Sequence, residues 1–407
     1  MDRSVSRTWV DAVVVGAGPA GLAASKALAR AGQSHVVLER GRVGSSWRTQ
    51  RWDSFRLNTP VWASRVPGRL MGEASAAFPT AGSLVAGLER LASHLPVVEG
   101  VEVRRAERLF DLWRLETSDR PLATRTVVVA SGFQNVPRLP AFSSALPTEI
   151  DQLHAGEYRS PHTLRGPVLV VGGGQSGLQI AEDVLAGGHR VYLATSPVGR
   201  LPRRYRGRDA FEWMRLAGQL DVPSGSVGPE QMAAAPPQIS GAGTVSYQAL
   251  AERGATLLGR VAPCDGQRLE LAGDLGANVR FADESSALFR ATWDAVAARV
   301  GQQGEPEHDP ADAPAPHLYG RRGPRSLDLA AAEIGTVIWA TGFGPSIDWL
   351  PDGALDNRRR PQLPGLHVIG APWLSHRSSA SLYGMVTDAE HIADSVAGGD
   401  RRLRLVA

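Results

Sequence analysis

Two glycine-rich stretches carry the clearest chemical signal in this sequence of 407 residues. Each has the spacing G-x-G-x-x-G, in which the first glycine allows a tight turn, the second lets a pyrophosphate approach the backbone, and the third lets the next helix pack closely. They comprise Gly16, Gly18 and Gly21 in the first stretch, and Gly172, Gly174 and Gly177 in the second. Because such turns aim helix N-terminal N–H groups at phosphates, they predict two nucleotide sites.

The residue that ends the following strand indicates which nucleotide each stretch binds. Glu39 lies 18 residues beyond the last glycine of the first stretch, where an acidic side chain grips ribose hydroxyls. The second stretch has Thr195 at the same distance, followed by Ser196. A carboxylate would repel a 2′-phosphate, whereas hydroxyl groups suit one. We therefore expect an adenine dinucleotide with a free ribose in the first site and NADPH in the second.

Basic residues near the second stretch could add to that phosphate site. They are Arg200, Arg203 and Arg204. We expect one of them to contact the phosphate, and an ordinary basic loop is the alternative. Although the isoelectric point is 9.3, the net charge is only +3 and the arginines are spread along the chain, so we expect no nucleic-acid partner.

The two stretches belong to one internal repeat, with an offset of 156 residues and no gap. The first copy predicts a strand at 13–15, a helix at about 20–31 and a strand at 35–38, and the second copy ends in a strand at 191–194. A βαβ unit repeated in this way predicts an α/β fold with two Rossmann-like dinucleotide-binding domains.

Apolar periodicity and composition predict the remaining elements. Expected helices lie at 82–94, 246–260, 287–300 and 382–396. Expected strands lie at 101–104, 112–116, 126–134, 336–344 and 366–370. The composition of 221–243 predicts a loop, and the prolines of 301–325 predict an exposed or partly disordered insert.

Composition excludes several other classes of protein. No run approaches 18 uninterrupted apolar residues, so we expect no membrane span and a cytoplasmic protein. Cys264 is the only cysteine, which excludes an internal disulfide and a C-x-x-C redox pair. The ten histidines are scattered, so we expect no metal site. Electrons must therefore leave a bound cofactor for oxygen, a substrate or an external acceptor.

Taken together, these motifs resemble those of the class B flavin monooxygenases, which are flavoproteins with two dinucleotide-binding domains. The group includes flavin-containing monooxygenases, YUCCA enzymes, Baeyer–Villiger enzymes and the bacterial CzcO-like proteins. The resemblance covers nearly the whole chain and rests on GAGPAG, GGGQSG, HAGEY at 154–158 and QRWDSFRLNTP at 50–60. It implies an FAD-binding domain at 1–148 and 342–407, with an NADPH-binding domain inserted at 149–341.

The family fingerprint F-x-G-x-x-x-H-x-x-x-[WYF] is kept only in part. His154 and Tyr158 match it, but Thr148 and Ile150 stand at its Phe and Gly positions. Tyrosine at the last position is similar to the branch that oxygenates nitrogen and sulfur. The residues leave open whether His154 is structural at the domain hinge or functional.

The resemblance also implies site residues. Asn58 falls where flavin-containing monooxygenases place an asparagine beside the reactive carbon of the flavin, which implies a catalytic role; a buried asparagine that only satisfies backbone groups is the alternative. The implied cofactor-binding residues are Gly16, Gly18, Pro19, Ala20, Gly21, Glu39, Arg40, Ser46, Trp47, Arg48, Val103, Ala130, Ser131, Gly132, Gly172, Gly174, Gln175, Ser176, Gly177, Thr195, Ser196, Arg203, Thr341 and Gly342.

The implied reaction is an oxygen insertion that uses FAD and NADPH. NADPH would pass hydride to the flavin, oxygen would add at C4a to give a hydroperoxide, and a small molecule, with an amine or sulfide favoured, would take one oxygen atom. Alternatives are an NADPH oxidase or flavin-dependent dehydrogenase, and a redox-sensing flavoprotein. We expect the loop around Asn58 and segments 221–243 and 372–384 to shape the substrate pocket. His376 and Arg377 could meet a polar substrate or cap the last helix; the oligomeric state is not predicted.

Overall fold

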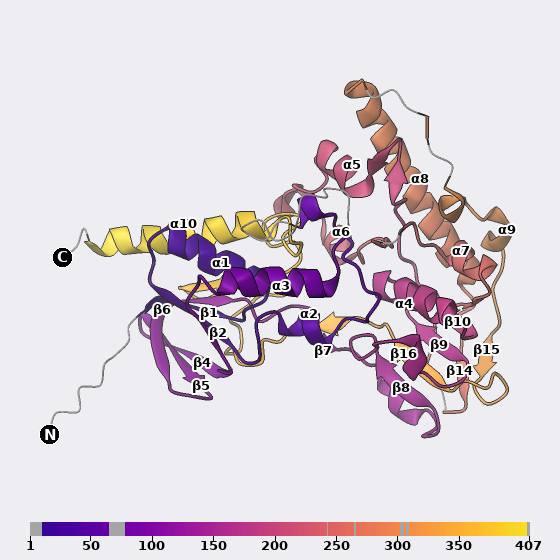
Figure 1. Ribbon diagram of the computed structural model, residues 1–407, viewed down its shortest axis with the longest axis horizontal. Helices are drawn as coiled ribbons and strands as arrows, with labels where there is room; N and C mark the ends of the chain where they lie inside the picture. Colours follow the sequence, from indigo (N-terminus) through magenta and orange to yellow (C-terminus); the bar gives the residue numbers. More distant parts are fainter. Residues whose placement is uncertain are drawn as a thin grey trace.

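The computed structural model describes residues 10–64, 78–241, 243–263, 266–301, 305–306 and 309–404. Two mainly parallel sheets, each covered by helices, lie at the left and right of Figure 1. The mixed α/β fold with two Rossmann-like units confirms the predicted fold class. Cys264 lies outside the described residues.

The first sheet has seven strands in the order β3-β2-β1-β6-β5-β4, with β18 beside β6. The strands are β1 Val10–Val15, β2 His35–Glu39, β3 Val97–Glu99, β4 Val103–Leu109, β5 Leu112–Thr117, β6 Leu122–Val129 and β18 Leu366–Val368. Strands β3, β2, β1, β6 and β18 are parallel, whereas β4, β5 and β6 form an antiparallel meander. The glycine turn therefore follows a central strand whose last four residues are buried.

Helices cover one face of this sheet and form its main core. They are α1 Pro19–Arg30, α2 Ser45–Thr49, α3 Ala81–Ala92 and α10 Met385–Arg404, with the short 3-10 helix η1 at Val61–Ala63. In Figure 1 the last helix, α10 in yellow, lies beside α1 in indigo. The small residues of α1 allow this approach, and Pro19 at its first turn suits a helix start because its missing N–H would have no partner there.

The second sheet has five parallel strands in the order β13-β10-β9-β16-β8. The strands are β8 Asp151–His154, β9 Val168–Val171, β10 Val191–Ala194, β13 Thr256–Leu258 and β16 Thr336–Trp339. Helix α4, Gln175–Ala186, follows β9 as α1 follows β1, so the internal repeat is confirmed as a repeat of structure. All the strands of this sheet fall between 151 and 339, inside the proposed NADPH-binding segment.

Smaller elements surround the second sheet. They are β11 Arg204–Tyr205, β12 Arg208–Asp209, α5 Ala210–Leu216, α6 Pro229–Ala233, α7 Tyr247–Glu252, β14 Arg268–Glu270, α8 Leu275–Arg299, α9 Pro316–Tyr319 and β15 Ser326–Asp328. Short 3-10 helices are η2 Ala141–Ala145, η3 Pro161–Thr163, η4 Ser224–Ser226 and η5 Pro310–Asp312. Strand β7, Val136–Pro137, pairs antiparallel with β17, Phe343–Gly344, where the chain passes between the sheets.

Three sequence-based expectations are wrong in extent. The helix expected at 246–260 ends at Glu252, because Gly254 adopts φ +102° and the chain then enters β13. The helix expected at 287–300 begins earlier, at Leu275, since the buried face of α8 there includes polar side chains that hide the apolar periodicity. Segment 301–325 is no purely exposed insert, because Asp312 and Ala315 are buried.

The remaining predicted helices and strands are confirmed with shifted ends, but segment 221–243, predicted as a loop, contains the short helices η4 and α6. The helix expected at 82–94 is α3, whose N-cap Thr80 accepts a hydrogen bond from the Ser83 N–H. The strands expected at 126–134, 336–344 and 366–370 stop earlier, before their small residues and glycines. None of the helices in the described ranges is long and apolar enough to cross a membrane.

Candidate functional site

The first glycine turn has the shape that a bound pyrophosphate requires. Gly16 adopts φ +108°, and a Cβ there would lie 2.4 Å from the Ala130 carbonyl oxygen. A Cβ on Gly21 would lie 1.9 Å from the Gly16 carbonyl oxygen, so the helix packs too closely for any side chain. Gly18, in contrast, faces open space at the start of α1. The open position is the one at which the backbone meets the phosphates in this motif, so the turn fits a dinucleotide.

The second turn reproduces these features in the other unit. Gly172 adopts φ +126° and would bring a Cβ to 2.4 Å from the Ala340 carbonyl oxygen. A Cβ on Gly177 would lie 1.8 Å from the Gly172 carbonyl oxygen, and Gly174 again faces open space. Ser176 lies beside these glycines in the first turn of α4. Both turns are therefore shaped for a pyrophosphate at a helix N-terminus.

Glu39 lies at the first turn, where the sequence predicted a ribose contact. Its side chain is buried, and Oε2 accepts a 2.8 Å hydrogen bond from the Ala17 N–H while Oε1 accepts one of 2.9 Å from the Gly41 N–H. Arg40 beside it is exposed. The Val101 N–H donates a hydrogen bond to the Glu39 carbonyl, which brings Val103 close to this turn. The side chain of Val103 is buried.

Ser196 makes the corresponding contact at the second turn. Its Oγ accepts a 3.0 Å hydrogen bond from the Gly173 N–H, and Gly173 corresponds to Ala17 in the repeat. Thr195, which aligns with Glu39, is fully occupied: its hydroxyl donates to the Leu258 carbonyl and accepts from Asn278 Nδ2. The acceptor at this turn is thus one residue further along than the alignment of the repeats predicts. A hydroxyl that accepts from the backbone can still donate to a phosphate, which a carboxylate cannot.

All three predicted phosphate arginines have protein partners, and Arg204 Nη2 donates a 3.0 Å hydrogen bond to the Gly207 carbonyl. Arg200 is completely buried and pairs with Asp283 at 2.5 Å and Asp312 at 2.9 Å. Arg203 is also buried; its guanidinium pairs with Asp209 and donates a 2.9 Å hydrogen bond to the Asn58 carbonyl. The structure therefore gives Arg200 and Arg203 structural roles in place of the predicted phosphate contact, because buried charges need a compensating partner.

The loop after the first βαβ unit carries three of the implied cofactor-binding residues and packs against α3. Ser46, Trp47 and Arg48 form the short helix α2. Trp47 packs against Phe55 with ring centroids 6.2 Å apart, and Arg48 donates to the Val43 carbonyl at 3.0 Å and pairs with Glu89. The last of these contacts joins the loop to α3, and the other two hold the loop together.

The small residues after β6 and β16 form the connection between the two units. Ala130 contacts Gly16, and Ser131 Oγ donates to the Ser346 carbonyl. Gly132 and Gly342 adopt φ +91° and +88°, values that glycine alone adopts readily. The hydroxyl of Thr341 donates to the carbonyl of Arg138, which ties the outgoing and returning chains together.

His154 has a structural role at this connection. Its Nε2 lies 2.9 Å from the Gly342 carbonyl, and Nδ1 accepts a hydrogen bond from the Gly156 N–H. Burial lowers the pKa of His154, which favours the neutral ring with its proton on Nε2. Tyr158 donates a 2.6 Å hydrogen bond to Asp183 on α4, and burial raises its pKa. Of the two interpretations left open for His154, the contacts support the structural one.

Asn58 lies between the two units. Its Nδ2 donates a 3.0 Å hydrogen bond to Gln175 Oε1 at the start of α4, and its Oδ1 accepts a 2.9 Å hydrogen bond from Gln179 Nε2. The predicted catalytic residue of the first unit is therefore in contact with the glycine turn region of the second. The sequence pattern could not reveal Gln179, which is 121 residues away.

Two predicted pocket segments meet near this point. The Ser224 N–H donates to the Ser375 carbonyl, so segments 221–243 and 372–384 lie together. A cavity of about 480 Å³ is lined by Trp62, Glu212, Arg215 and Tyr383. The Trp62 and Tyr383 rings meet edge to face, with centroids 6.3 Å apart. His376 lies 4.0 Å from Asp388 in the first turn of α10, which favours helix capping over substrate contact.

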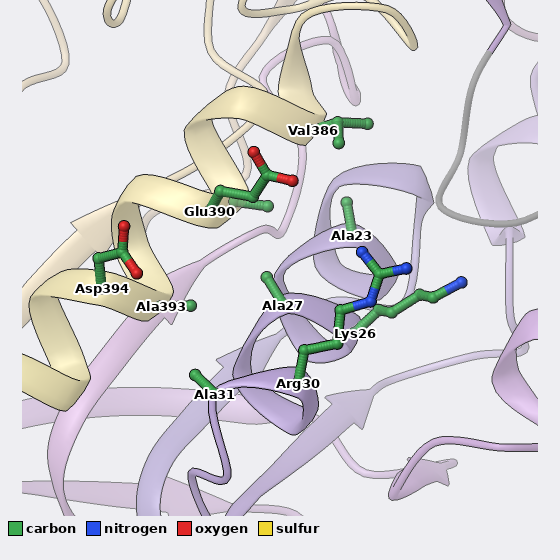
Figure 2. A pocket seen from close by; sticks show the side chains of 10 residues that line it. Ala23, Lys26, Ala27, Arg30, Ala31, Val386, Glu390, Ala393 and Asp394 are labelled. Carbon is green, nitrogen blue, oxygen red and sulfur yellow. The ribbon is translucent and has the colours of Figure 1, made fainter.

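A second hollow lies between α1 and α10 (Figure 2). Its floor consists of small side chains such as Ala27 and Ala393, with Lys26 and Arg30 on one side and Glu390 on the other. It lies along the later turns of α1, away from the glycine turn. Within the described ranges, no cluster of His, Cys, Asp or Glu side chains could hold a metal ion.

Comparisons with known proteins agree with this geometry. The family model for pyridine nucleotide-disulphide oxidoreductases matches residues 13–204. The chain is 27% identical over 401 residues to an uncharacterized oxidoreductase CzcO of Bacillus subtilis, covering 95% of this chain and 99% of that protein. It is 31% identical to the probable indole-3-pyruvate monooxygenase YUCCA3 of Arabidopsis thaliana, covering 50% of this chain and 51% of that protein.

Solved structures share the fold over nearly the full length. A flavin-containing monooxygenase from Stenotrophomonas maltophilia is 19% identical with a TM-score of 0.64, covering 96% of this chain and 98% of that chain. OTEMO in complex with FAD and NADP is 16% identical with a TM-score of 0.55, covering 97% of this chain and 86% of that chain. Fold and site thus define an α/β protein with two Rossmann-like units, each with a glycine turn shaped for a dinucleotide. The chain resembles CzcO-like oxidoreductases over nearly its whole length and YUCCA monooxygenases over about half of it, and it shares the fold of flavin monooxygenases.

Proposed function

We propose that this protein is an FAD- and NADPH-dependent monooxygenase that transfers one oxygen atom from O2 to a small molecule. The observation that carries the proposal is the position of Asn58, which follows the first glycine unit and is held by two side chains of α4 in the second. A residue in this place can contact both cofactors at the point where they meet. Bound flavin would supply the activation of oxygen, with NADPH as the source of hydride.

In this proposal, residues of the protein bind the two cofactors and orient them toward each other and the substrate. The first turn and Glu39 would hold FAD, and the second turn and Ser196 would hold NADPH, with the Ser196 hydroxyl donating to the 2′-phosphate. Asn58 would donate its remaining amide hydrogen at the flavin. The cavity lined by Trp62, Glu212, Arg215 and Tyr383 would take the substrate.

We also propose the finer assignments that the sequence suggested. The FAD-binding domain comprises 1–148 and 342–407, and the NADPH-binding domain comprises 149–341; the membership of the two sheets supports this division. Amines and sulfides are the favoured substrates, because Tyr158 stands where the branch that oxygenates nitrogen and sulfur has a tyrosine. The protein acts in the cytoplasm on a free small molecule.

The proposal is tested by NADPH consumption with amines, sulfides, ketones and an aromatic 2-oxo acid, with mass analysis of the products. The expected result is a product heavier by one oxygen atom for one substrate class, with 18O label from 18O2. Rapid mixing of the reduced protein with oxygen should give a long-lived transient absorbance band. Direct return to the oxidised spectrum, with every electron pair recovered as hydrogen peroxide, would instead identify an NADPH oxidase.

A further inference from the structure

The side chain of Asn58 is part of a chain of three amides that crosses from one unit to the other. Gln175 and Gln179 are one turn apart on α4 and present their side chains to the same loop. Gln175 Oε1 accepts from Asn58 Nδ2 at 3.0 Å, and Gln179 Nε2 donates to Asn58 Oδ1 at 2.9 Å. Gln179 is buried, so its amide has little access to water as an alternative partner.

Two backbone carbonyls determine the donor and acceptor ends of the hydrogen bonds among these three amides. Gln179 Nε2 also donates to the Ile239 carbonyl at 2.6 Å, and Gln175 Nε2 donates to the Pro237 carbonyl at 2.8 Å. A carbonyl oxygen only accepts hydrogen bonds, so each glutamine must turn its nitrogen toward the backbone. Asn58 must then present its oxygen to Gln179 and its nitrogen to Gln175. A flipped Asn58 would place nitrogen against nitrogen and oxygen against oxygen.

The same backbone segment also holds the main chain at Asn58. Arg203 Nη1 donates to the Asn58 carbonyl at 2.9 Å and to the Ser240 carbonyl at 3.4 Å. A Cβ on Gly241 would lie 2.4 Å from the Leu57 carbonyl oxygen, so the two segments touch there. Main chain and side chain of Asn58 are thus both fixed by residues 237–241 and α4.

We propose that Gln179 is a positioning residue that fixes which end of the Asn58 amide faces the flavin. The inference rests on the proposed function and deepens it, because it assigns a role to a residue outside the glycine motifs. Among the described residues, Asn58 Nδ2 keeps one N–H without a partner, and Gln179, acting with Gln175, determines where that N–H points. Loss of Gln179 would let the amide rotate, so that its oxygen faces the cofactor for part of the time.

Two substitutions of Gln179 separate orientation from packing. Gln179→Glu is nearly isosteric but places acceptor oxygens against the Ile239 carbonyl and Asn58 Oδ1, which favours the flipped amide. Gln179→Met keeps the length and removes the hydrogen bonds. Gln152→Met is the matched control, because Gln152 also bonds through its amide, accepting from Trp339 Nε1 at 3.0 Å, but lies outside the three-amide chain.

NMR signals of side-chain amides can report the orientation of the Asn58 amide without a measurement of catalytic turnover. Asparagine occurs only at 58, 135, 278 and 357, so protein labelled with 15N-asparagine gives few side-chain amide signals. In the FAD-bound protein, Gln179→Glu and Gln179→Met should shift the Asn58 pair and leave the Asn357 pair in place, whereas Gln152→Met should leave both. An Asn58 pair that does not move in either Gln179 variant would overturn the proposal.

Kinetics test whether the orientation matters to the reaction. Gln179→Met should accelerate the decay of the oxygen-dependent transient band about tenfold, with more peroxide released, while anaerobic reduction by NADPH changes less than about twofold. In an Asn58→Ala background the same substitution should add nothing, because its effect passes through Asn58. An equal effect in both backgrounds would overturn the role of Gln179. If the wild-type protein itself forms no band, the proposed function fails, and the amide spectra alone decide the orientation.

Discussion

Replacing Ser196 with aspartate should change which nicotinamide nucleotide the protein accepts. Ser196 Oγ accepts a hydrogen bond from the Gly173 N–H, just as Glu39 Oε2 accepts from the Ala17 N–H at the other turn. An aspartate at 196 can keep this acceptor, so the turn keeps its shape. It also brings a negative charge to the place proposed for the 2′-phosphate, which makes the second turn resemble the first.

The size of the effect follows from the repulsion between the two charges. Two unit charges about 5 Å apart at an effective dielectric constant of about 20 repel by about 3 kcal/mol, which corresponds to about a 100-fold weaker binding of NADPH. NADH lacks the phosphate, and its ribose hydroxyls can donate to the new carboxylate, so its binding should stay equal or improve. The preference of the protein would then reverse.

Anaerobic rapid mixing measures this directly, because the flavin bleaches as it accepts hydride. The observed rate is followed against the concentration of NADPH and, separately, of NADH, which gives an apparent Kd for each. Thr195→Ser is the comparison variant: the Thr195 hydroxyl is occupied by Leu258 and Asn278, so the ratio of the two Kd values should not change. Equal weakening of both nucleotides by Ser196→Asp, or no weakening of either, would refute the placement of the phosphate beside Ser196.

Three further perturbations test the parts that surround the site. Gly21→Ala should abolish FAD uptake, read as a colourless protein, because its Cβ would lie 1.9 Å from the Gly16 carbonyl oxygen and push the helix off the turn. Arg200→Met should lower the free energy of unfolding by about 3–5 kcal/mol in denaturant titrations, because two buried carboxylates lose their main cation. His154→Gln should remove part of the loss of stability on acidification. Since burial lowers the pKa of His154 below its usual 6.5, its contribution is present above that pH and is lost as the pH falls below it.

Each of these has a clear contrary result. If the Gly21→Ala protein has a normal flavin content, the turn can accommodate a Cβ at position 21, contrary to what its geometry indicates. An Arg200→Met protein as stable as the wild type would mean that the buried pair adds nothing over a hydrophobic side chain of similar size. The thermal unfolding midpoints of the wild type and of His154→Gln can be compared between about pH 8 and about pH 5. If both midpoints fall in parallel, His154 does not contribute to the loss of stability in acid.

The glycine turns were predictable because local backbone geometry dictates them. Only glycine fits where a Cβ would meet a carbonyl oxygen, so glycines appear in the sequence at a fixed spacing. The same spacing occurs in both copies of the repeat, which strengthens the prediction. The strands around them are continuous apolar runs for the same local reason. Much of the fold could therefore be predicted from the two βαβ units alone.

The contacts that complete the site join residues far apart in the chain, and no local pattern encodes them. Arg200 finds its partners 83 and 112 residues away, which converted a predicted phosphate ligand into part of a buried ion pair. Ser196 was among the predicted residues, but the alignment of the repeats placed Thr195 opposite Glu39, and only the structure shows that the Ser196 hydroxyl is the one that reaches the turn. The early part of α8 was missed since its buried polar side chains serve tertiary contacts that override the helical pattern.

The pairing of β7 with β17 bears on how this architecture can be rebuilt. Pro137 and Phe343 are partners across that small ladder, so the chain leaves the first unit and returns to it at neighbouring points. The segment between Pro137 and Phe343 can therefore be replaced by the corresponding segment of a related protein. Both junctions lie next to each other, so no additional linker is needed. A chimaera joined there would receive the proposed NADPH-binding unit of its donor, with the nucleotide preference of that unit, and would keep the proposed FAD-binding unit of its host.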